Sequence, residues 1–92
     1  MTKKEKVEND AYMVLNELAF GFRKTDNGLR IVAINLKNLD QRASFRVREK
    51  DLLLCESNMS KENTYKTMLI VERNKARLIE GMNTWANMQK TK

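Results

Sequence analysis

Residues 22–36 read FRKTDNGLRIVAINL, with two β-prone runs on either side of Asp26-Asn27-Gly28. Asn-Gly between such runs is the strongest short-range signal for a hairpin, because both residues tolerate the positive φ of a type I′ turn. We therefore expect an antiparallel hairpin whose two-residue turn is Asn27-Gly28. In that register Arg23 faces Val32 and Thr25 faces Arg30.

The run at residues 44–48, SFRVR, alternates strictly and predicts a third strand after a polar loop at 37–42. The period of two places Phe45 and Val47 on one side of the sheet, with Arg46 and Arg48 on the other. Residues 29–48 also carry apolar side chains at helical spacing. A single helix in an all-α bundle is therefore the competing interpretation of this region.

Helices are expected before and after the sheet along the sequence. Thr2-Lys3-Lys4-Glu5 has capping-box spacing, so a helix should begin there and end near Phe20, closed by Gly21. The run LLLCE at 52–56 predicts a short helix, and Ser60 predicts the N-cap of a long final helix. The pair Ile70-Val71 leaves a strand at 67–71 as an alternative.

These elements predict an α+β fold in the order N-terminal helix, three-stranded antiparallel meander, short helix and long C-terminal helix. The length of 92 residues fits one small domain over 1–92, with residues 1–3 and 89–92 frayed. Such a small core is marginal, so a homodimer is expected. We find no secretory signal and no apolar run of membrane-spanning length, and we expect a cytoplasmic protein with no membrane partner.

Several classes of function are excluded because the residues that they require are absent from the sequence. The chain has no histidine, which excludes histidine-dependent catalytic arrangements and most zinc sites. Its three glycines form no phosphate-binding loop. We therefore predict no enzyme, no catalytic residue, no cofactor and no metal. The single cysteine, Cys55, is interpreted as a small hydrophobic residue without a chemical role.

The positive charge is concentrated in residues 23–50, which hold eight cationic and three acidic side chains, a net charge of +5 out of +6 for the chain. The cationic residues, which we predict to bind nucleic acid, are Arg23, Lys24, Arg30, Lys37, Arg42, Arg46, Arg48 and Lys50. A local excess of this size favours a polyanionic partner.

Strand alternation predicts that Arg23, Arg30, Arg46 and Arg48 share one outer face of the sheet. Val32 and Ile34 fall on the same face, so the final helix could cover it. On that helix, Lys66, Arg73 and Arg77 are spaced like an ordinary salt-bridged solvent face. Near its end, Met82, Trp85 and Met88 are candidates for a partner interface, although a core role is the more common one.

The leading functional hypothesis is a small nucleic-acid-binding or transcription-associated regulator, with DNA rather than RNA as the expected partner. The alternative is a protein-binding adaptor or inhibitor that directs its basic face at an acidic surface of another protein. The Lys- and Asn-rich, proline-free composition also fits a regulator encoded by a phage or plasmid. Both hypotheses describe binding rather than turnover.

Overall fold

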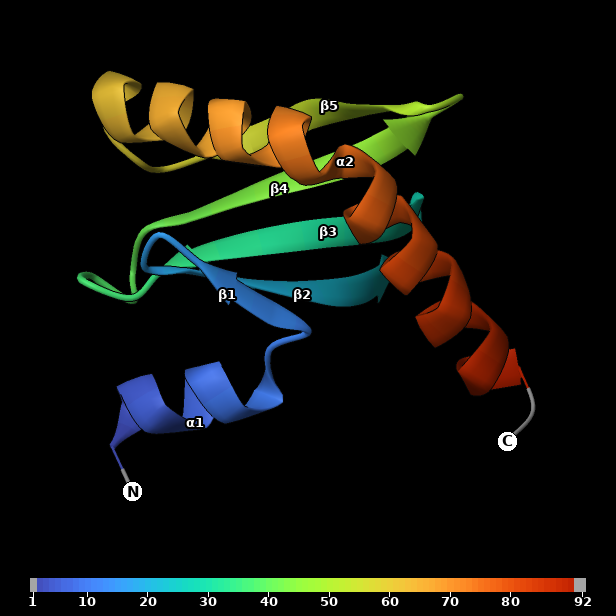
Figure 1. The fold of residues 1–92 in the computed structure, drawn as a ribbon, viewed down its shortest axis with the longest axis horizontal. Helices are drawn as coiled ribbons and strands as arrows, with labels where there is room; N and C mark the ends of the chain where they lie inside the picture. The colour runs from blue at the N-terminus through green and yellow to red at the C-terminus, as the bar shows by residue number, and fades with distance from the viewer. Residues whose placement is uncertain (1, 91–92) are drawn as a thin grey trace.

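The computed structural model describes residues 2–90. Along the chain the elements are α1 Lys3–Asp10, β1 Met13–Leu15, β2 Leu18–Thr25, β3 Gly28–Asn35, β4 Arg42–Arg48, β5 Asp51–Ser57 and α2 Lys61–Lys90. The strands form one antiparallel sheet in the order β1-β2-β3-β4-β5 (Figure 1). The predicted three-stranded meander followed by a short helix is wrong, and so is the all-α bundle, because the chain forms a five-stranded antiparallel sheet with a short N-terminal and a long C-terminal helix.

The predicted hairpin is present as β2 and β3, with a turn one residue earlier than expected. Arg23 pairs with Arg30 and Thr25 with Gly28, so the two-residue turn is Asp26-Asn27. The hydroxyl of Thr25 donates to the carbonyl of Gly28 at 2.9 Å and accepts from the backbone N–H of Asn27 at 3.2 Å. Gly28 supplies the positive φ, 110°, from the first position of β3.

The N-terminal helix ends ten residues earlier than predicted. Its start is confirmed, because the Thr2 hydroxyl caps it by accepting from the N–H of Glu5 at 3.1 Å. Residues 13–20 instead form the β1–β2 hairpin, turned at Asn16 and Glu17 with φ of 50° and 64°. The reason is tertiary: α1 buries none of its own side chains, whereas Phe20 in β2 is fully buried.

The short helix predicted at 52–56 is the edge strand β5. Its residues pair with β4, and Glu49-Lys50 make the connecting turn, Glu49 having a φ of 59°. Leucine favours helices in isolation, but five residues are too few for a stable helix and the β4 ladder offers both hydrogen bonds and a core contact. A bulge beside Ser44 and Phe45 shifts the register opposite Cys55, which is exposed.

The long final helix is confirmed, and the alternative of a strand at 67–71 is wrong. Ser60 caps α2, since its hydroxyl accepts from the N–H of Asn63 at 3.1 Å. Figure 1 shows α2 running obliquely across one face of the sheet, with α1 beside β1 and β2. The core between sheet and helix includes Phe20, Ile31, Phe45, Val71 and Leu78.

Part of the predicted terminal fraying falls on residues 1, 91 and 92, which lie outside the described residues. Thr2 and Lys3 are the N-cap and first residue of α1, and Gln89 belongs to α2. None of the helices within residues 2–90 is long and apolar enough to cross a membrane.

Candidate functional site

The final helix and the predicted arginine face lie on opposite sides of the sheet. Ile31 and Phe45 contact the α2 core, so alternation turns Arg30 and Arg46 to the other side. Val32 and Ile34 lie there too and are half-buried. We call this side the open face. Near β1 and β2 this face is closed, since Ala19 is buried there and α1 contacts β2.

Three arginines line up across neighbouring strands of the open face. Arg23 on β2 is directly paired with Arg30 on β3. Ile31 faces Phe45, and continuing that register by one residue places Arg30 beside Arg46 on β4. We call Arg23, Arg30 and Arg46 the arginine row. With strands about 4.8 Å apart, the row crosses the sheet over about 10 Å.

The arginine row has no internal charge compensation. Among residues 2–90, no ion pair involves any of the three guanidinium groups. Like charges placed directly opposite each other destabilise a sheet. Arg30 is half-buried and its Nη1 donates to the carbonyls of Leu29 at 3.1 Å and Asn27 at 3.4 Å, which ties it to the hairpin. Arg23 and Arg46 are exposed.

The other predicted nucleic-acid-binding residues are distributed unevenly. Arg48 lies on the open face two residues beyond Arg46, next to the turn that holds Lys50. Arg42, paired with Ile34, lies on the same face toward the opposite end of β4. Lys24 alternates to the side of α2 and Lys37 follows β3. The structure therefore brings Arg48 and Lys50 to the arginine row, but not Lys24, Lys37 or Arg42.

The predicted partner interface at the end of α2 is split between core and surface. Met82 is 4% exposed and belongs to the core, whereas Met88 is 61% exposed. Trp85 packs on Phe22, with ring centroids 6.0 Å apart, and Phe22 packs on Tyr12 at 5.0 Å. These aromatic rings border a cavity of about 500 Å³. Of the three residues, Met88 is exposed, Trp85 is half-buried and Met82 is buried.

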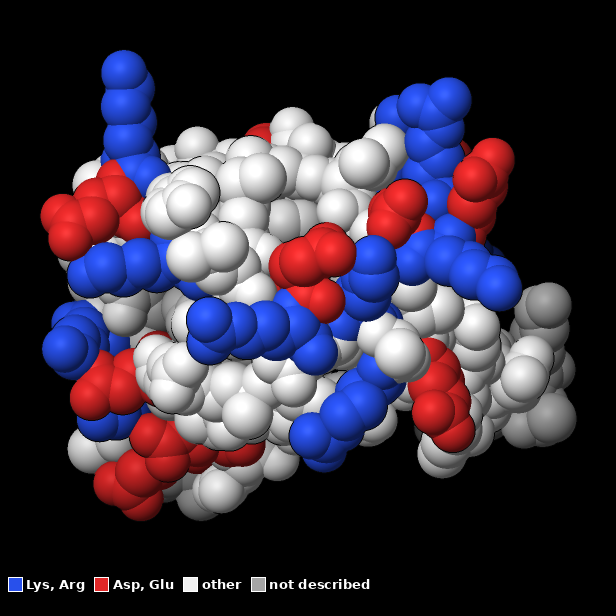
Figure 2. Space-filling model, turned by 45° about the horizontal axis from the view of Figure 1, so that its top comes forward, with Lys and Arg blue, Asp and Glu red and all other residues white. Residues whose placement is uncertain are grey.

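Charges on α2 are interspersed rather than segregated. Figure 2 shows Lys and Arg alternating with Asp and Glu around a pale area without charge. The expected pair of Lys66 and Glu62 is present at 3.1 Å. Lys75 contacts Asp51 at 2.9 Å and Glu72 at 3.0 Å, and the hydrogen bond to Asp51 is the main reason that its pKa is raised.

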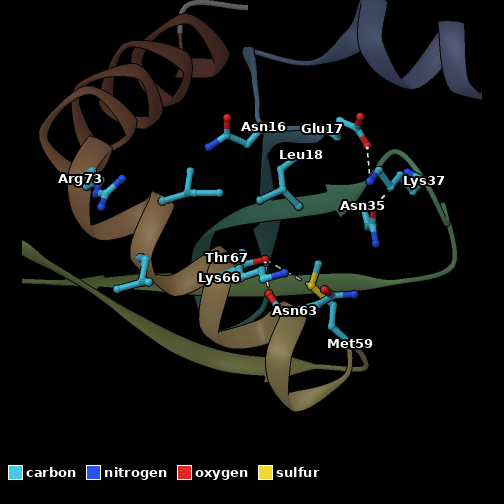
Figure 3. Close-up of a pocket in the computed structure, with 12 residues that line it drawn as sticks. Asn16, Glu17, Leu18, Asn35, Lys37, Met59, Asn63, Lys66, Thr67 and Arg73 are labelled. Atoms are coloured by element: carbon cyan, nitrogen blue, oxygen red, sulfur yellow. Dashed lines mark hydrogen bonds and ion pairs between the residues drawn. The ribbon is translucent and has the colours of Figure 1, made fainter.

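The sequence did not predict a groove that lies between α2 and the end of the sheet at the β1–β2 turn. It has a volume of about 530 Å³ and is bordered by the β1–β2 turn, the end of β3 and the first half of α2 (Figure 3). Lys66 and Arg73 line it, although the sequence pattern assigned both to an ordinary solvent face. Their spacing of seven residues indicated that they share one side of the helix. No pattern in the neighbouring sequence showed that this side would meet the β1–β2 turn.

Within the described part of the chain, no group of three or more histidine, cysteine, aspartate or glutamate residues is placed to hold a metal ion. In comparisons with known proteins, neither a family model, nor a curated sequence, nor a solved structure matched this chain.

Proposed function

We propose that the protein binds nucleic acid through the open face of its sheet. The observation that carries this proposal is the arginine row: Arg23, Arg30 and Arg46 on three adjacent strands, with no described carboxylate to pair with them. A phosphate backbone supplies the missing negative charges, and guanidinium groups bind phosphate bidentately. Arg48 and Lys50 extend the positive surface toward the β4–β5 turn.

The open face combines fixed and adaptable cations. Arg30 is tied to backbone carbonyls of the hairpin, whereas Arg23 and Arg46 on either side are exposed and free to follow a phosphate chain. Along β3 the open face continues beyond Arg30 with Val32 and Ile34, which add apolar contact surface. This arrangement favours binding along the backbone over a hydrogen-bonded code for base sequence.

Fluorescence anisotropy with labelled DNA and RNA oligonucleotides over a range of salt concentrations tests the proposal. We expect affinity to fall steeply with salt, with DNA bound more tightly than RNA. Removing one phosphate contact, in Arg23→Ala or Arg46→Ala, should reduce the log–log salt slope by about 0.7–0.9.

Arg77→Ala is the matched control, because it removes the same charge from an exposed site on α2. It should change the slope by much less than Arg46→Ala. Equal effects of the two substitutions would show that only net charge matters, and salt-independent or absent binding would overturn the proposal.

A protein-binding adaptor is the second candidate, supported by exposed apolar side chains at the start of α2. Tyr65, Met68 and Leu69 are 63%, 43% and 42% exposed, and grouped apolar surface of this kind is typical of protein contacts. A pull-down with and without nuclease separates the candidates. An acidic protein that stays bound after nuclease treatment, and is released by Tyr65→Ser, would favour the adaptor.

A further inference from the structure

The groove beside α2, about 530 Å³ in volume, has an apolar floor and a polar rim. Leu18 and Met59 in the floor are 7% and 9% exposed. The hydroxyl of Thr67 is also buried there, and it is satisfied by the carbonyl of Asn63 at 2.8 Å. In Figure 3, Leu18 lies between α2, which carries Lys66 and Arg73, and the β1–β2 turn, which carries Asn16.

The rim carries an excess of positive charge. Lys37, Lys66 and Arg73 line the groove, while its only acidic lining residue is Glu17, which is paired with Lys37 at 3.4 Å. Lys66 has an exposed partner outside the groove, Glu62. Arg73 takes part in no ion pair or hydrogen bond within residues 2–90. An anion in the groove would therefore gain partners without breaking a buried pair.

The size of the groove and its apolar floor indicate which chemical group is attached to the anionic group of the ligand. A volume of about 530 Å³ is within the range of small-molecule sites and far exceeds that of a bare phosphate ion. Leu18, Met59 and Ile70 offer apolar surface for a flat ring. Asn16 makes no hydrogen bond through its side-chain amide among the described residues, and an amide can pair with the edge of a base.

We propose that this groove binds a nucleoside monophosphate, with the phosphate between Lys66 and Arg73 and the base over the apolar floor. The two cations are two helical turns apart, about 10 Å along α2, so side chains of their length can converge on one phosphate. The site lies on the α2 side of the sheet, away from the arginine row, and is independent of nucleic-acid binding on the open face.

Titration of the isotope-labelled protein with adenosine 5′-monophosphate, followed by amide NMR shifts, tests this site. We expect saturable shifts at Asn16, Lys66 and Arg73, and none at Arg46. Inorganic phosphate and adenosine, each lacking one half of the ligand, should bind at least about tenfold more weakly, as expected for the loss of one charge-assisted or apolar contact set. Equal binding of phosphate alone would overturn the assignment of a nucleotide.

Arg73→Ala should weaken binding about tenfold, the effect of losing a charge-assisted hydrogen bond. Arg77→Ala, one turn along α2 and outside this groove, is the control and should change affinity less than twofold, within the usual scatter for a contact-free site. Asn16→Gly keeps the positive φ of the turn while removing the amide, and should weaken the nucleotide but not phosphate. Equal losses in Arg73→Ala and Arg77→Ala, or no shifts at millimolar nucleotide, would refute the site.

Discussion

The two faces of the sheet are built from alternate residues of the same strands, yet the centre of one face is buried and apolar whereas the centre of the other carries a row of cations. On the α2 side, Phe20, Ile31 and Phe45 are at most 1% exposed. On the open face the neighbours Arg30 and Arg46 place cations beside each other. Burial of apolar side chains on the α2 side stabilises the fold and offsets the repulsion between like charges on the open face.

The largest effect is expected on the α2 side. Phe45→Ala should lower the free energy of unfolding by about 3–5 kcal/mol, because it removes a fully buried ring and leaves a cavity. Chemical denaturation measures this. Arg46→Ala, the adjacent residue on the open face, should change stability by no more than about 0.5 kcal/mol. Similar losses in the two variants would remove the distinction between the faces.

Gly81 tests how closely α2 approaches the start of the sheet. A methyl group at this position would come within 2.5 Å of the Tyr12 ring. Alanine normally stabilises a helix interior by about 1 kcal/mol relative to glycine, but here Gly81→Ala should destabilise by a similar amount. In a Tyr12→Ala background the same substitution should become stabilising. Thermal unfolding of the four proteins measures the change, and an unchanged sign would show that the contact is unimportant.

On the open face, a substitution can improve stability while damaging function. Arg23→Thr removes a like-charge pair with Arg30 and introduces a β-favouring residue. The free energy of unfolding should therefore rise by about 0.2–1 kcal/mol. DNA affinity should fall at the same time. Parallel denaturation and anisotropy measurements test this pairing of effects, and a loss of both stability and affinity would contradict it.

The smallest effect is expected at Lys75, where the charges are compensated. Its raised pKa means that contacts with Asp51 and Glu72 favour the ammonium form, so they stabilise the fold below the usual lysine pKa of 10.5 and are lost as the pH rises above it. Lys75→Met should therefore lower the melting temperature slightly at pH 7–9, with a difference that narrows in 1 M salt. A difference that persists in strong alkali would indicate lost packing instead.

The assignment of residues to the two faces could be made from the sequence, although the pairing could not. Moving the turn from Asn27-Gly28 to Asp26-Asn27 shifts the partner of Arg23 from Val32 to Arg30. A shift by two residues changes partners but preserves the face of every side chain. The convergence of Arg23, Arg30 and Arg46 was therefore predictable, whereas their alignment in a row required the register.

Elements that depend on distant contacts were not predictable. Leu18 fits the apolar stripe of a helix as well as it fits a strand, and only the burial of Leu18 and Phe20 against α2 decides between the two. The run at 52–55 likewise has no period of its own, and it is a strand because β4 offers a ladder. The groove at Lys66 and Arg73 is formed by the β1–β2 turn together with α2. These two segments are far apart in the sequence, so no local sequence pattern predicts that they meet.

Cys55 gives the molecule a practical handle. It is the single cysteine of the chain, it is exposed, and it lies at the bulge of the edge strand rather than in the arginine row or the groove. A thiol-reactive fluorophore or spin label would therefore attach at one known position in the unmodified sequence. Distances from that position to a labelled oligonucleotide or nucleotide would report separately on the two proposed sites, without any engineered residue.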